Sequence, residues 1–146
     1  MSVEPGIVDA NDYAMDAEAS QHKASRAILE AARAPSTTLY LTSRIRCEFY
    51  SIVTNARRVV TACSPAEALR AISALLAFPG IRVLPSPIGA VAVWMELLAR
   101  YPVKGGDVFD LQLVATMQAN NVRRIYTFNM EDFEVFPELV VLVPHA

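Results

Sequence analysis

Residues 64–84, SPAEALRAISALLAFPGIRVL, contain the signals for one complete helix followed by one strand. Ser64 and Glu67 have capping-box spacing, and the proline between them stands at the first helical position, so a helix is predicted to begin here. A Pro-Gly pair ends that helix near its last apolar residues. The four residues that follow, Ile81 to Leu84, are mostly apolar, which is typical of a strand with helices on both faces.

The same alternation of strands and helices continues in both directions from this segment. Strands are predicted at Gly6 to Val8, Thr37 to Leu41, Ile81 to Leu84, Ile125 to Phe128 and Leu139 to Val143. Helices are predicted at Gln21 to Arg33, from Thr42 or Ser43 to about Val60, from Ser64 to about Phe78, from Ser86 to about Tyr101 and from Gly105 to about Asn120. This alternation indicates an α/β fold with a mainly parallel sheet. No linker or repeat divides it, so residues 1–146 are expected to form a single domain.

Composition narrows the class of protein. Hydrophobic residues make up 53% of the 146 residues and charged residues 19%, which excludes a disordered chain and a coiled coil. The formal net charge is −2, so any polyanionic partner has to be held locally rather than by a general basic field. The most apolar segment, 88–99, is interrupted by Glu96 and is shorter than the about 20 residues of a membrane span. A soluble cytoplasmic protein without membrane partners is expected.

Two acidic residues stand where ligand sites form in this class of fold. Asp9 follows the first predicted strand, and Asp132 lies four residues beyond the end of the fourth, at Phe128. Open α/β sheets bind their ligands outside the carboxyl ends of the strands. Both side chains are therefore candidates for a functional site.

Two further carboxylates interrupt apolar helical faces. Glu48 has helical spacing with Ile45 and Phe49, and Asp110 has the same spacing with Val114 in a later helix. Burying an unpaired carboxylate is unfavourable, so each needs a partner. Converging carboxylates repel one another unless a divalent cation joins them, and oxygen ligands favour Mg²⁺ or Mn²⁺ over zinc. Such a site suits hydrolysis of phosphodiesters.

Each acid also has a structural interpretation. Glu48 could pair with Arg44, one helical turn earlier. Asp107 fits an N-cap, with Asp110 then at the third position of a capping box. Asp9 and Asp132 could each cap a turn. The sequence leaves these alternatives open.

The order and surroundings of the four acids resemble the PIN-domain nucleases, and among them the VapC toxins of bacterial type II toxin–antitoxin pairs. Asp9 follows the apolar pair IV, Glu48 lies in RCEFYSIVTN, Asp110 in VFDLQLVATM and Asp132 in TFNMEDF. The stretches SPAEALRAISALLAFPGIRVLP and WMELLARYPVKG are similar to that subgroup as well. The resemblance extends over nearly the whole chain.

The resemblance implies a three-layer α/β/α fold with a central sheet of about five strands. It implies that Asp9, Glu48, Asp110 and Asp132 bind one or two Mg²⁺ or Mn²⁺ ions, with which an activated water hydrolyses RNA. The supporting residues that it implies are Asn11 for Asp9, Thr127 and Asn129 for Asp132, and Asp107 as either a fifth acid or a cap. It also implies a homodimer and a cognate antitoxin that places a basic side chain among the acids.

One segment departs from the family pattern. After Asp9-Ala10-Asn11 the family usually continues with several apolar residues, whereas Asp12 follows directly here and the segment is about two residues short. An alternative function is therefore a PIN-like domain with weakened catalysis that binds RNA or a protein partner without turnover.

Overall fold

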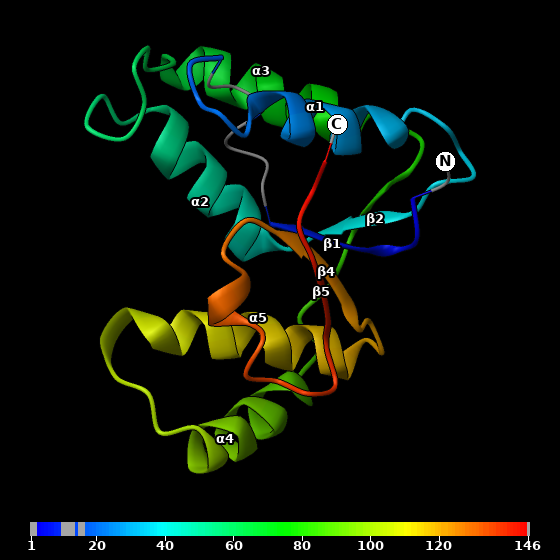
Figure 1. Ribbon diagram of the computed structural model, residues 1–146, viewed down its shortest axis with the longest axis vertical. Helices are drawn as coiled ribbons and strands as arrows, with labels where there is room; N and C mark the ends of the chain where they lie inside the picture. Colours follow the sequence, from blue (N-terminus) through cyan, green and yellow to red (C-terminus); the bar gives the residue numbers. More distant parts are fainter. Residues whose placement is uncertain (1–2, 10–13, 15–16, 146) are drawn as a thin grey trace.

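The structure is a computed structural model that describes residues 3–9, 14 and 17–145 (Figure 1). Its centre is one sheet in which every neighbouring pair of strands is parallel, in the order β3-β2-β1-β4-β5. The strands are β1 (Gly6–Asp9), β2 (Leu39–Leu41), β3 (Ile81–Val83), β4 (Arg124–Thr127) and β5 (Val140–Leu142). All five predicted strands are confirmed, each with its ends within about two residues of the prediction.

Helices cover both faces of the sheet. The α-helices are α1 (His22–Ala31), α2 (Ser43–Val53), α3 (Pro65–Leu76), α4 (Ala90–Arg100) and α5 (Val108–Ala119), and two short 3-10 helices are η2 (Gly105–Asp107) and η3 (Met130–Asp132). In Figure 1, α1, α2 and α3 lie on one side of the sheet, and α4 and α5 on the other. The three-layer α/β/α fold is therefore confirmed. None of the helices in the described part of the chain combines the length and the apolar character that crossing a membrane requires.

Local capping explains where two of these helices begin. At α3 the hydroxyl of Ser64 accepts from the backbone N–H of Glu67, whose carboxylate accepts in return from the N–H of Ser64, as the capping box predicts. At α2 the hydroxyl of Thr42 accepts from the N–H of Ile45 at 3.1 Å. Both caps satisfy backbone donors that a helix end leaves without partners.

Helix α2 ends at Val53, so the prediction that it continues to about Val60 is wrong. The hydroxyl of Thr54 donates to the carbonyl of Tyr50 at 2.7 Å, and the N–H of Cys63 donates to the carbonyl of Val53 at 2.8 Å. Asn55 then accepts through its side chain from the backbone of Arg57 at 3.0 Å, forming a turn. The chain therefore loops between α2 and α3. Similarly, α4 begins at Ala90 rather than at Ser86.

The middle of the sheet forms the core and also locates the site. Ile7, Val8 and Ile125 on the central strands β1 and β4 are completely buried. The strand order reverses between these two strands. From β1 the chain builds outward through β2 and β3 on one side, and β4 and β5 then lie on the other side of β1. The carboxyl ends of strands at such a reversal are where open α/β sheets bind ligands.

Candidate active site

The four acids predicted from the sequence line one cavity of about 300 Å³ at this edge of the sheet. Asp9 is the last residue of β1, Glu48 lies on α2, Asp110 on the first turn of α5, and Asp132 at the end of η3. The remaining lining residues are Ile45, Phe49, Ser51, Ile52, Arg58 and Asn129. The fold thus gathers four carboxylates from four separate elements.

Asp9 is held by the neighbouring strand. It pairs in register with Thr127 across β1 and β4, and the Thr127 hydroxyl donates to Asp9 Oδ2 at 3.3 Å. The same hydroxyl accepts from the backbone N–H of Asn129 at 3.1 Å. Thr127 was expected to support Asp132, so this contact is a correction. The parallel register of β1 and β4 places the wholly buried Thr127 beside Asp9. Asp132 lies at the end of η3, beyond the end of β4.

Asn129 supports Asp132 through the backbone. The N–H of Asp132 donates to the carbonyl of Asn129 at 3.1 Å, which closes the turn that η3 forms after β4. Asn129 also lines the cavity. The other expected supporting residue, Asn11, lies outside the described residues, as does the short segment that follows Asp9.

Glu48 has the ion-pair partner that its sequence spacing allows. The Arg44 guanidinium donates to Glu48 Oε1 within α2. Arg44 also lies over the ring of Phe109, with 4.7 Å between the guanidinium carbon and the ring centroid. Glu48 therefore faces the cavity while its charge is partly balanced by Arg44.

The pKa of Asp110 is shifted by its surroundings in the cavity. Burial, followed by repulsion from the Asp132 carboxylate, raises the pKa of Asp110 from 3.8 to about 6, with smaller contributions from Glu48 and Asp107 and an opposing one from Arg44. A like charge within a few Å disfavours ionisation of a carboxyl group. Asp110 therefore lies close enough to Asp132 and Glu48 for their negative charges to disfavour its ionisation.

Asp107 has neither of the contacts expected of it. It stands at the N-cap position of α5, but its side chain makes no capping hydrogen bond there and it does not line the cavity. The reason is that Asp107 already has helical backbone angles as the last residue of η2, whereas a capping side chain works from an extended residue. The expected capping box with Asp110 is therefore absent.

The donor set fits a hard divalent cation in its chemistry. Four carboxylates and the Asn129 side-chain amide offer the oxygen ligands that Mg²⁺ and Mn²⁺ prefer. Within residues 3–9, 14 and 17–145, however, no three acidic, histidine or cysteine side chains are arranged closely enough to form a ready-made metal site. The residues suit the ion, and their side chains would have to close around it.

The sequence did not single out Arg58 and Phe109 as candidate site residues. Arg58 is the one basic residue among the described residues that line the cavity. It reaches the cavity because α2 ends early and the following loop turns back. The contact of Phe109 with Arg44 joins α5 to α2 and has no signal in the local sequence.

Comparison with known proteins agrees with this fold. Residues 12–139 match the PIN domain family, a match that includes Glu48, Asp110 and Asp132 and begins just after Asp9. The chain therefore belongs to the PIN-domain family.

Within that family the chain is VapC-like. It is 31% identical over 110 residues to a VapC ribonuclease of Mycobacterium bovis and to Ribonuclease VapC43 of Mycobacterium tuberculosis, which covers 75% of this chain and 74% of each relative. Two solved structures have a similar fold. VapC20 of M. tuberculosis, described as a toxin that cleaves the sarcin–ricin loop, has a TM-score of 0.69 at 17% identity over 97% of this chain and 100% of its own. VapBC2 of Rickettsia felis, solved with a promoter DNA fragment, has a TM-score of 0.66 at 14% identity over 97% and 99%.

Proposed function

We propose that this protein is a Mg²⁺- or Mn²⁺-dependent endoribonuclease and the toxin of a toxin–antitoxin pair. The observation that carries the proposal is the convergence of four carboxylates in one cavity where the strand order reverses. The similarity to VapC ribonucleases supports RNA as the substrate class. An RNA substrate places the proposed activity in the cytoplasm.

Asp9, Glu48, Asp110 and Asp132 would hold the cation. When bound, it neutralises charge on the phosphate and lowers the pKa of a water molecule. The chain's own residues prepare this arrangement. Thr127 holds the Asp9 carboxylate through its hydroxyl, and the backbone of Asn129 anchors the turn that presents Asp132.

Arg58 supplies the positive charge that an acidic cavity needs when it receives a polyanion. It lines the cavity from the loop after α2, while the acids come from the strand ends and from α2 and α5. An arginine side chain is suited to bind a phosphate oxygen beside the one that reacts. We therefore propose that Arg58 contacts the RNA backbone.

Two protein partners complete the proposal. A basic side chain of a cognate antitoxin would enter the acidic cavity, where carboxylates offer a receptor for arginine; the relative VapBC2 is itself a toxin–antitoxin complex by its description. A second copy of this chain would cover the apolar face of α4, where Val91 and Met95 are 59% and 62% exposed. Light scattering of the purified protein tests the homodimer.

The test of the activity compares the wild-type protein with two variants on a mixed RNA substrate in Mg²⁺, Mn²⁺ or EDTA. Asp110→Asn is expected to abolish metal-dependent cleavage. Glu30→Gln, which changes a carboxylate on α1 away from the cavity, is expected to leave it intact. Folded, metal-binding protein that cleaves none of the RNAs would contradict the nuclease proposal and favour the alternative of binding without turnover.

A further inference from the structure

Arg44 is built into the acidic site by three interactions. It donates to Glu48 Oε1, it lies over the Phe109 ring at 4.7 Å, and its charge lowers the pKa of Asp110 against the effect of the surrounding acids. Its side chain is only 24% exposed. A guanidinium held this way keeps its position better than a solvated arginine does.

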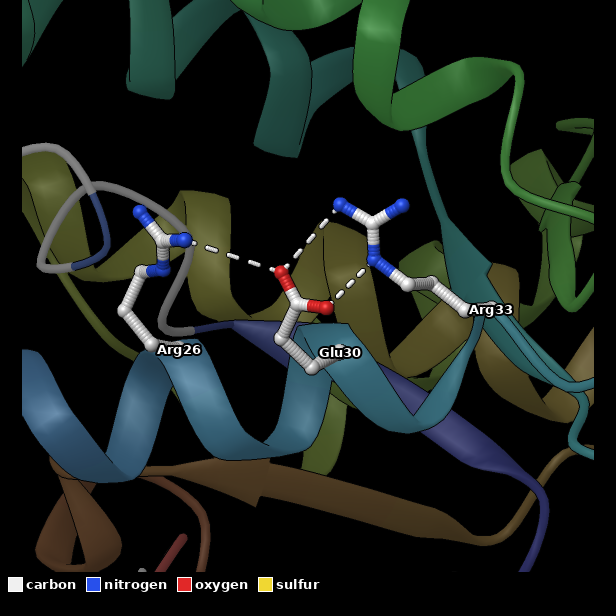
Figure 2. A network of polar contacts seen from close by, with 3 residues as sticks. All are labelled: Arg26, Glu30 and Arg33. Carbon is white, nitrogen blue, oxygen red and sulfur yellow. Dashed lines mark hydrogen bonds and ion pairs between the residues drawn. The ribbon is translucent and has the colours of Figure 1, made fainter.

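A second arginine of the chain makes the same pair of contacts in a different place. Arg33, two residues beyond the end of α1, donates to Glu30 on that helix and lies over the Phe78 ring at 4.5 Å (Figure 2). Arg26 also reaches Glu30, so that acid has two basic partners (Figure 2). Arg33 is 63% exposed. The two arginines make the same two kinds of contact and differ in their surroundings.

The surroundings of Arg44 set it in competition with a cation. Glu48 is one of four carboxylates in the cavity, and Arg44 occupies one of its oxygens. If Glu48 bound a divalent ion while it still accepted from the Arg44 guanidinium, the two positive charges would lie a few Å apart. At that distance they repel each other strongly. Arg44 and an ion therefore compete for the charge of Glu48, so closing the acids around an ion weakens the Arg44–Glu48 pair.

We propose that Arg44 is an internal counter-ion: it holds Glu48 in the metal-free protein, stabilises the empty site and lowers its affinity for the divalent cation. This inference rests on the proposed function, because it takes Glu48 as a metal ligand. Phe109 acts as the platform that fixes Arg44 in place. The consequence is a dissociation constant for the divalent cation that is higher than the carboxylates alone would give.

The experiment measures Mn²⁺ affinity by titration calorimetry and melting temperature with and without Mn²⁺. It is done at pH 8, well above the pKa of about 6 of Asp110. Arg44→Met removes the charge and keeps an apolar stem against Phe109. It is expected to bind Mn²⁺ about tenfold more tightly than the wild type, a factor that corresponds to 1.4 kcal/mol. Its metal-free form is expected to melt at a lower temperature, so Mn²⁺ raises its melting point further.

Two more variants separate this role from ordinary ion pairing. Arg33→Met, the matched control, is expected to leave Mn²⁺ affinity unchanged. Phe109→Leu keeps Arg44 and removes its platform, so it is expected to tighten Mn²⁺ binding by a smaller factor; this variant changes a side chain that is 48% exposed and keeps the test open if Arg44→Met does not fold.

The outcomes distinguish the inference from the function on which it rests. If Arg44→Met binds Mn²⁺ with the same affinity as the wild type, or more weakly, the proposed role of Arg44 is overturned and the nuclease proposal still stands. Absence of Mn²⁺ binding in the folded wild type and in every variant overturns both.

Discussion

Replacing Asp110 by asparagine is expected to stabilise the metal-free protein at neutral pH although it removes a group of the active site. In the folded protein the pKa of Asp110 rises from 3.8 to about 6. The folded state therefore binds this proton more tightly than the unfolded state does. The contribution to stability is fully present below pH 3.8 and is lost as pH rises through about 6. Asparagine is neutral at every pH, so the stability of the variant does not decrease in this pH range for this reason.

The magnitude follows from the shift and from the exposure of the group. A change of about two pKa units corresponds to ~3 kcal/mol. Because Asp110 is only half-buried, solvent screening reduces this to ~1–1.5 kcal/mol. Asparagine also loses the interaction of the carboxylate with the N-terminus of α5, ~0.3–1 kcal/mol. The net gain, ~0.6 kcal/mol in the middle of these ranges, corresponds to a rise in melting temperature of roughly 1–2 °C for a domain of this size.

The assay is thermal unfolding in EDTA at pH 7.5 and at pH 4. The matched control is Asp107→Asn, which changes an exposed acid at the start of the same helix. This variant also loses the interaction with the helix N-terminus, but it removes little of the repulsion between carboxylates. Asp110→Asn is expected to melt above the wild type at pH 7.5 and level with it at pH 4, while Asp107→Asn melts slightly below it at pH 7.5. An Asp110→Asn protein that is no more stable at pH 7.5, or equally stabilised at both pH values, would refute the reasoning.

Three further outcomes are expected. Thr127→Val removes the hydroxyl shared by Asp9 and the Asn129 N–H, so urea unfolding should show a loss of ~1–3 kcal/mol for the two part-buried hydrogen bonds, and RNA cleavage should fall with it; unchanged cleavage would contradict a positioning role. Ser64→Ala breaks the capping box of α3 and should cost ~1 kcal/mol without changing Mn²⁺ affinity. Leu97→Ala empties a completely buried position on α4 and should cost ~2–5 kcal/mol in the same urea assay, and a loss below that range would show that the site collapses around the smaller side chain.

The fold could be predicted because its signals are local. The strand at Ile81 is marked by the Pro-Gly pair before it, and α3 by Ser64 and Glu67, all within one short stretch of chain. Boundaries that depend on distant contacts were not predictable. The end of α2 at Val53 depends on a backbone bond from Cys63, which no periodicity within the helix reveals.

The candidate site divides in the same way. That Asp9 and Asp132 would meet at one edge of the sheet followed from their positions after strands, and Arg44 with Glu48 followed from one helical turn of spacing. The hydrogen bond of Thr127 to Asp9 needed the strand order, because β1 and β4 are far apart in the chain and adjacent in the sheet. The position of Arg58 at the cavity depends on the loop after α2, and the contact of Phe109 with Arg44 depends on the packing of α5 against α2.

The sequence by itself determined the alternation of strands and helices and the four acids of this VapC-like PIN domain, since both depend on residue type, spacing and short-range hydrogen bonds. Apart from the Arg44–Glu48 pair within one helix, only the tertiary structure decided what the acids contact. Asp110 and Asp132 acquire their mutual repulsion, and Arg44 its place on Phe109, only when elements remote in the chain are packed together. Coulomb and stacking energies depend on distances through space, and the order of residues along the chain does not specify those distances.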